Sequence, residues 1–351
     1  MKRPKLKWGL AALLLASLAG AQSPKPQADD RTLYLYIWSE YIDDAIVEDF
    51  EKKFGVNVVI DLYESNEDML AKLLGGGVSQ YDLVVPSDYA IPAMIQQKLL
   101  APLEHHKLPN FKNLDPKFVN PPFDPGNRYS IPYQWGTQGL AYRADLVQDL
   151  PRSWGVLFDP ELQQGPFVLN DTMRDTMGSA AIYLGYSVNT TDPDELRDIE
   201  RLLRATTPRA HSFVGGVGGK NQLLAGVATV AMVYAGDALK AAEENENIRY
   251  FVPDEGGIVW VDNIAITAGA RHKDLAHAFI NYLLEADVGA RLSEYNWYAS
   301  PNRASLPLID PELREDESVF PSPELMKKLQ FQEDIGKQRR LWDTVWTNIK
   351  N

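Results

Sequence analysis

The chain has 351 residues, of which 45% are hydrophobic and 24% charged, a composition that excludes a disordered, collagenous or polytopic membrane protein. It contains no cysteine, which excludes disulfides, thiolate nucleophiles and Cys-based zinc sites. The formal net charge of −13 disfavours binding to a nucleic-acid backbone.

The first predicted element is a secretory signal over residues 1–21. Residues 2–7 carry four positive charges, Gly9–Ala19 is a short apolar run, and Ala19-Gly20-Ala21 is an A-x-A cleavage site. Cleavage there takes the formal charge from −13 to −17, and residues 22–31, with two prolines, are expected to be a disordered leader. Because no cysteine follows the cleavage site, we expect a periplasmic protein that is exported by a cleaved signal peptide and carries no lipid anchor.

The following residues alternate strand-like and helix-like segments, which is typical of α/β layers. Asp43 or Asp44 is the expected N-cap of the first helix, and Gly55 is expected to end it. In the first part of the chain the expected strands are Thr32–Trp38, Asn57–Leu62, Tyr81–Pro86 and Tyr129–Tyr142, and the expected helices are 46–54, Asn66–Leu74 and Tyr89–Gln97. A Pro- and Asn-rich stretch, Pro102 to Asn127, is expected to wrap the surface.

A second α/β set follows, so that two domains, each with its own core, are expected. Its predicted strands are Phe167–Asn170, Thr229–Val233 and Ile258–Thr267, and its predicted helices are 172–184, Asp194–Ala205, Gly236–Glu243, Lys273–Glu285 and Glu324–Lys350. The glycine run Gly215–Lys220 lacks phosphate-loop spacing and is expected to be a turn that leads into a helix. Two α/β lobes predict a ligand cleft between them.

Sequence signatures of catalysis are absent. None of the five histidines forms H-E-x-x-H, and there is no G-x-S-x-G nucleophile elbow. The four histidines near loops or a helix start are expected at the surface: His105, His106, His272 and His277. We therefore expect no enzymatic activity, no catalytic residue, no metal and no cofactor.

Aromatic residues and carboxylates gather instead at the ends of predicted strands, where open α/β sheets bind their ligands. These residues are Trp38, Glu40, Tyr41, Tyr89, Asp171, Asp175, Tyr234, Trp260 and Asp262. Hardly any Arg or Lys accompanies them. Aromatic faces attract ammonium groups and carboxylates bind them through charge-assisted hydrogen bonds, so the pattern favours an elongated cation with an apolar stem.

Each of these residues also has a purely structural interpretation. Trp38 and Trp260 are equally compatible with a core position, and Asp171 and Asp175 with capping the first turn of a helix. Asp262 is the strongest candidate, because it interrupts an apolar strand and a buried carboxylate is costly without a partner.

Several motifs in order along the chain resemble the spermidine/putrescine-binding proteins of bacterial ABC importers. They are Tyr36-Ile37-Trp38-Ser39-Glu40-Tyr41, Tyr63-Glu64-Ser65-Asn66-Glu67, 81–87, 129–136, 184–193, 255–262 and Ser300-Pro301-Asn302. The resemblance implies a bilobal, type II periplasmic-binding-protein fold. It also implies a lobe one of residues 32–136 and 262–303, and a lobe two of residues 137–261 and 304–351.

By the same resemblance, the polyamine-contacting positions are Trp38, Ser39, Glu40, Tyr41, Ser87, Tyr89, Asp175, Trp260, Asp262, Tyr298 and Gln332. Three positions depart from the family pattern: Thr172 stands where aspartate is usual, Asp175 where glutamate is usual, and Tyr234 where tryptophan is usual. Asp171, beside Thr172, is a candidate substitute for the missing carboxylate.

The predicted function is therefore capture of spermidine or putrescine by a monomeric protein that delivers it to inner-membrane ABC permease subunits. A ligand that contacts both lobes would favour the closed form. Two alternatives stay open. A secreted glycoside hydrolase also uses paired carboxylates and aromatic platforms, and a binding protein for another solute, such as an amino acid, would need an Arg or Lys in the cleft, which the strand ends do not show.

Overall fold

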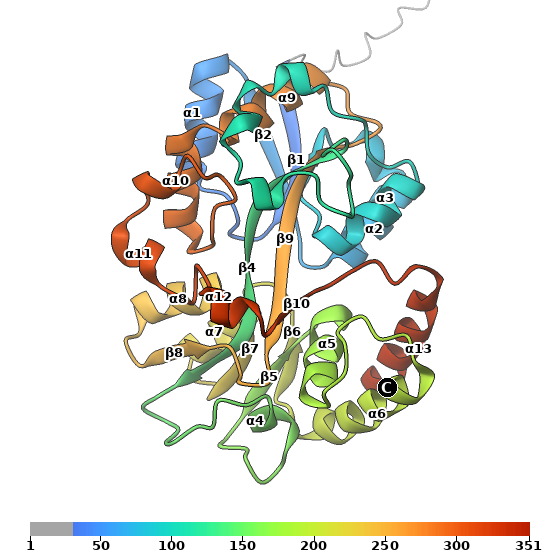
Figure 1. The fold of residues 1–351 in the computed structure, drawn as a ribbon, viewed down its shortest axis with the longest axis vertical. Coiled ribbons are helices and arrows are strands. Elements are labelled where there is room, and N and C mark those ends of the chain that lie inside the picture. The colour runs from blue at the N-terminus through green and yellow to red at the C-terminus, as the bar shows by residue number, and fades with distance from the viewer. Residues whose placement is uncertain (1–30) are drawn as a thin grey trace, which may run out of the picture. The chain divides into compact units, whose positions relative to one another are not determined.

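The computed structural model describes residues 31–351, so the predicted signal peptide and all but the last residue of the leader lie outside the described residues. Within that part of the chain, one sheet has the strand order β2-β1-β3-β9-β4-β7-β5-β6, with β10 paired to β9 and β8 paired to β4 (Figure 1). No helix of residues 31–351 is long and apolar enough to cross a membrane.

Lobe one is built around the parallel strands β1, β2 and β3. Its elements are β1 (Thr32–Trp38), α1 (Asp44–Phe54), β2 (Asn57–Tyr63), α2 (Asn66–Leu74), β3 (Leu83–Val84), α3 (Ile91–Gln96), α9 (Lys273–Leu283) and α10 (Ala286–Asn296). Asp43 caps α1 by accepting a hydrogen bond from the amide of Ala45, and Gly55 ends that helix at φ 65°, as predicted. Phe50 and Phe279 meet edge to face in the core, with ring centroids 4.8 Å apart.

Lobe two has a separate core in which Trp154 and Trp342 are fully buried. Its elements are α4 (Gly155–Phe158), β5 (Phe167–Asn170), α5 (Met173–Tyr183), α6 (Pro193–Thr206), β6 (Ser212–Val214), α7 (Gly218–Leu224), β7 (Val230–Tyr234), α8 (Ala235–Glu244), β8 (Ile248–Phe251) and α13 (Arg339–Lys350). The glycine run predicted as a turn over Gly215–Lys220 is non-helical only over residues 215–217, because α7 already begins at Gly218.

Two long antiparallel strands, β4 (Ser130–Arg143) and β9 (Gly257–Ile266), run through both lobes (Figure 1). At one end β9 pairs with β3 of lobe one, and near the other end β4 pairs with β7 and β8 of lobe two. A further apolar cluster, which includes Trp135, Val259 and Leu313 of α11 (Pro311–Glu315), also packs along this ribbon. The residue boundaries expected for the two lobes remain a prediction.

The segment after residue 320 differs from the long helix predicted over Glu324–Lys350. It forms α12 (Pro323–Met326), then β10 (Leu329–Phe331), and only afterwards α13. β10 supplies backbone hydrogen bonds to Gly257–Val259 of β9, on the edge that β3 is too short to cover. Tertiary pairing therefore overrides the helical pattern at this point.

Two smaller predictions are also corrected. The strand predicted over Tyr81–Pro86 shortens to β3, and the helix after it starts as a 3-10 turn. His277 is buried rather than exposed, because the stretch after Pro102 covers α9 and the Glu104 amide donates to its Nε2 at 2.9 Å. His272 is also largely buried, with its Nδ1 3.1 Å from Asp82.

Candidate functional site

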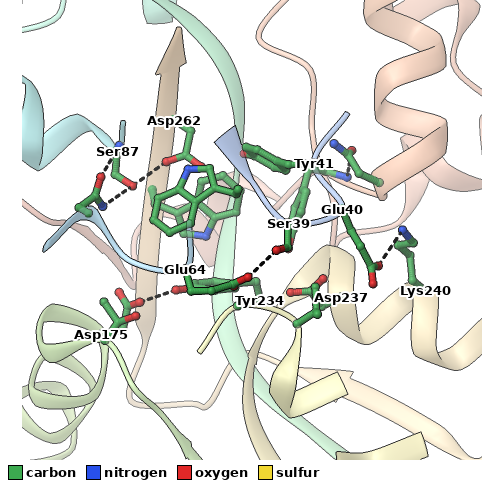
Figure 2. Close-up of a pocket in the computed structure, with 18 of the residues that line it drawn as sticks. Ser39, Glu40, Tyr41, Glu64, Ser87, Asp175, Tyr234, Asp237, Lys240 and Asp262 are labelled. Carbon is green, nitrogen blue, oxygen red and sulfur yellow. Dashed lines mark hydrogen bonds and ion pairs between the residues drawn. The ribbon is translucent and has the colours of Figure 1, made fainter. Parts of the chain in front are cut away.

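A cavity of about 710 Å³, including the solvent at its mouth, lies where β4 and β9 pass from one lobe to the other (Figure 2). Its lining residues come from both lobes: Trp38, Ser39, Glu40, Tyr41, Glu64, Asn66, Ser87, Tyr89, Thr172, Asp175, Gly216, Val217, Tyr234, Asp237, Lys240, Trp260, Asp262, Asn296, Tyr298 and Gln332.

Aromatic rings form one wall of this cavity. The Trp260 ring lies 5.0 Å from that of Tyr298 and 5.9 Å from that of Tyr234, both nearly perpendicular to it. Gly136 is the partner of Trp260 across the β4–β9 ladder, and a Cβ there would come within 2.8 Å of the indole. Glycine at this position therefore lets the rings close over the ribbon, and their faces can attract a cation at about 0.5–2 kcal/mol per ring.

Asp262 projects into the cavity from β9 and is only 6% exposed. It accepts a 2.6 Å hydrogen bond from the Ser87 hydroxyl. Asn66 holds Ser87 in turn, by donating from Nδ2 to the Ser87 Oγ at 3.0 Å and accepting from the Ser87 amide at 3.1 Å. Burial raises the pKa of Asp262 to about 7, which the Ser87 hydrogen bond only partly offsets.

Asp175 provides a second buried carboxylate, in the first turn of α5. The Tyr234 hydroxyl donates to one oxygen at 2.5 Å, and Nε2 of Gln332 donates to the other at 3.0 Å (Figure 2). Burial raises the pKa of Asp175 to about 6. The partners of Asp175 and Asp262 are thus neutral groups, which leaves both carboxylates able to take a cation.

A different arrangement holds Glu40, which follows β1 with a left-handed φ of 52°. Lys220 lies 2.5 Å and Lys240 3.4 Å from the same carboxylate oxygen. Burial acts to raise the pKa of Glu40, but the two lysines outweigh it and hold that pKa below its usual value. The strand ends themselves carry no lysine of the cavity, but Lys240 reaches the cavity from the second turn of α8, beyond the end of β7.

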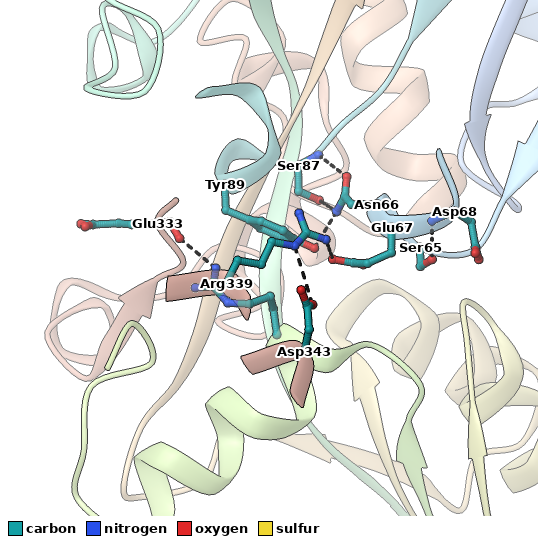
Figure 3. A network of polar contacts seen from close by, with 10 residues as sticks. Ser65, Asn66, Glu67, Asp68, Ser87, Tyr89, Glu333, Arg339 and Asp343 are labelled. Carbon is teal, nitrogen blue, oxygen red and sulfur yellow. Dashed lines mark hydrogen bonds and ion pairs between the residues drawn. The ribbon is translucent and has the colours of Figure 1, made fainter. Parts of the chain in front are cut away.

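Outside the cavity, a second ion pair joins the lobes. Arg339 of α13 lies 2.9 Å from Glu67 of α2, and Glu67 is the neighbour of Asn66, which also donates to the Tyr89 hydroxyl at 2.9 Å (Figure 3). This network connects the C-terminal helix to the residues that hold Ser87.

Every site residue predicted from the sequence lines the cavity except Asp171. Asp171 instead pairs with Lys350 of α13 at 2.7 Å, so it cannot replace a carboxylate at Thr172. Sequence reasoning missed seven lining residues: Glu64, Asn66, Gly216, Val217, Asp237, Lys240 and Asn296. Glu64 and Asp237 follow the ends of β2 and β7, so the strand-end rule, applied to every strand, would have found them.

Fold and cavity together define a two-lobed solute-binding protein of the type II periplasmic class. A family model described as bacterial extracellular solute-binding protein matches residues 45–321, and the chain belongs to this family. The predicted fold class is confirmed.

Relatives of known name match over nearly the whole chain. The spermidine/putrescine-binding periplasmic protein of Escherichia coli K12 is 36% identical over 345 residues, covering 98% of this chain and 99% of the relative. The putrescine-binding periplasmic protein SpuD of Pseudomonas aeruginosa UCBPP-PA14 is 36% identical over 359 residues, covering 97% of this chain and 97% of the relative. The solved spermidine/putrescine ABC transporter substrate-binding protein PotD of Streptococcus pneumoniae has a TM-score of 0.77 at 33% identity, covering 91% of this chain and 98% of that one. The resemblance predicted from the motifs is therefore confirmed.

Proposed function

We propose that this protein binds polyamines between its lobes in the periplasm and delivers them to an inner-membrane ABC permease. One observation carries the proposal: Asp175 and Asp262 are buried in an aromatic-walled cavity and have only neutral hydrogen-bond partners. Two carboxylates in this state each gain a charge-assisted bond when an ammonium group enters. The names of the relatives, spermidine/putrescine-binding and putrescine-binding, support the same ligand class.

Binding in this site couples to closure of the lobes. Asp175 and Tyr234 belong to lobe two, whereas Ser87 and Tyr41 belong to lobe one. A ligand that contacts both sets has more contacts in the closed form than in the open form, so it shifts the equilibrium toward closure. The permease would then distinguish loaded from empty protein by this change of shape.

The protein acts as a monomer, without catalysis, after cleavage of its signal peptide and without a lipid anchor. The predicted ligand contacts are those of the cavity, without Asp171, whose carboxylate is paired elsewhere.

The two alternative functions, a glycoside hydrolase and a receptor for an amino acid, have less support. The relatives that match over the whole chain are named as binding proteins, which does not support the glycoside hydrolase. The lysine that an amino-acid receptor would require is present, but its ammonium lies 3.4 Å from Glu40 and is therefore not free for a ligand carboxylate.

Calorimetric titration of the mature protein tests the proposal. Putrescine, spermidine and spermine are compared with 1,4-butanediol, which has the stem of putrescine but no charge. Saturable binding of at least one polyamine and none of the diol is expected. Absence of binding to all three amines, or turnover of a glycoside, would overturn the proposal.

A further inference from the structure

We infer that Lys220 and Lys240 make this site selective for diamines over triamines, an inference that rests on the proposed polyamine function. The key observation is that Glu40 already has two ammonium partners within the protein, at 2.5 Å and 3.4 Å. A ligand ammonium that approaches Glu40 therefore meets a carboxylate whose negative charge is already neutralised by lysines of the protein.

The lysines are held in place rather than free to swing away. The side chain of Lys220 is only 5% exposed, and Lys240 lies over the Tyr295 ring, with its Nζ 4.6 Å from the ring centroid. Burial raises the pKa of Asp237 to about 6, and the charges of Lys220 and Lys240 only partly offset this effect. Glu40, Asp237, Lys220 and Lys240 together form the Glu40 cluster, two acids and two bases with no formal net charge.

Elsewhere in the cavity, two buried carboxylates have no lysine partner. Asp175 and Asp262 accept hydrogen bonds only from the neutral groups of Ser87, Tyr234 and Gln332. Besides the Glu40 cluster and the exposed Glu64, whose hydrogen-bond partner is the Ser39 hydroxyl, the cavity therefore offers two buried carboxylates without an ion-pair partner, Asp175 and Asp262. Two ammonium groups on one apolar stem satisfy them, which is the chemistry of a diamine.

A third ammonium group that approached the Glu40 cluster would meet Lys240, which also lines the cavity. Like charges brought together in a partly buried site disfavour that ligand. To reach Glu40, the triamine would also have to break the ion pair between Glu40 in lobe one and Lys220 of α7 in lobe two. Rejection of the longer ligand thus follows from an ion pair that joins the two lobes.

The test compares dissociation constants for putrescine and spermidine in the wild type and in Lys220→Gln and Lys240→Gln. Lys327→Gln is the matched control, because it removes the same charge from an exposed side chain whose ion-pair partner is Glu324. Circular dichroism and thermal melting verify that each variant is folded, and Lys240, on the outer part of the cluster, serves if the more buried Lys220 variant is unstable.

The wild type should bind putrescine more tightly than spermidine. Each lysine variant should shift the ratio of the two constants toward spermidine by at least about tenfold, the effect of one gained hydrogen bond to a charged group, with no shift in the control. This shift toward spermidine should disappear in the double variant Lys240→Gln, Glu40→Gln, because that variant has no Glu40 carboxylate to bind the third ammonium group.

An unchanged ratio in folded lysine variants would overturn the inference, as would a wild type that prefers spermidine. Either result leaves the polyamine function standing. Absence of any polyamine binding by the wild type would overturn the function itself and the inference with it.

Discussion

Ser87 donates a 2.6 Å hydrogen bond to Asp262, although the two residues are 175 positions apart in the chain. An isolated bridge between the same two residues in the backbone brings the loop after β3 against the crossing part of β9. The carboxylate is therefore oriented toward the cavity before any ligand arrives. A group pre-organised in this way loses less entropy on binding.

The first prediction concerns the charge of Asp262. Asp262→Asn keeps the shape but removes the charge, and should cost about 2–5 kcal/mol of putrescine binding, the range for truncating one member of a buried charge pair. That corresponds to roughly thirtyfold to several-thousandfold in affinity. The unliganded variant should be at least as stable as the wild type, because burial disfavours the ionised carboxyl.

Calorimetry and thermal melting on one preparation decide this prediction. Asp254→Asn, at an exposed position, controls for the loss of one negative charge. A destabilised Asp262→Asn that still binds normally would instead make Asp262 a structural member of the Ser87 network.

The second prediction concerns pH. The ligand amines, with pKa values of about 10, stay charged across the range pH 5–8, whereas burial raises the pKa of Asp262 to about 7 and that of Asp175 to about 6. Binding requires both groups ionised, so affinity should fall as the pH decreases through 7 and more steeply below 6. Binding at pH 6 should release protons, which titrations in buffers of different ionisation enthalpy measure.

The same shifts determine how the stability of the unliganded protein depends on pH. A carboxyl whose folded pKa exceeds its unfolded value near 4 binds more protons when folded, so stability should decrease as the pH rises from 4 to 7. Asp262→Asn should flatten this slope and remove the step in affinity near pH 7. A flat affinity profile in the wild type would contradict the assignment of these two groups as ligand contacts.

The third prediction concerns Thr172, which is buried and lines the cavity at the start of α5. Thr172→Asp adds a carboxylate without a lysine partner and should move the preference toward spermidine. The adjacent Asp171→Asn is the control, since Asp171 faces Lys350 rather than the cavity. If the ratio of the dissociation constants is the same in both variants, position 172 does not contact ligand.

The fourth prediction concerns closure. Saturating putrescine should change the fluorescence of Trp38 and Trp260, which line the cavity, and decrease the radius of gyration measured by X-ray scattering. Glu67→Gln removes one inter-lobe ion pair whose partners are each about one-third exposed, so affinity should fall by only a few fold. Scattering profiles that are identical with and without ligand would count against closure.

Local patterns of the sequence were sufficient for much of the fold. Apolar periodicity, together with caps such as Asp43 and Gly55, predicted α1, β1 and β5 almost residue by residue, because these signals act over a single turn or strand. Asp262 was identified as a candidate because it is a carboxylate within the apolar run of β9. The cost of desolvating such a group can be inferred from the sequence without knowing its partner.

Tertiary structure decided what depends on partners distant in the chain. β10 forms because the edge of β9 lacks a partner, which the helical pattern of residues 324–350 does not reveal. Asp171 pairs with Lys350, 179 residues away, and so leaves the site. Glu40 meets Lys220 across the cleft, and whether a carboxylate is free for a ligand is determined by such long-range neighbours rather than by residue type.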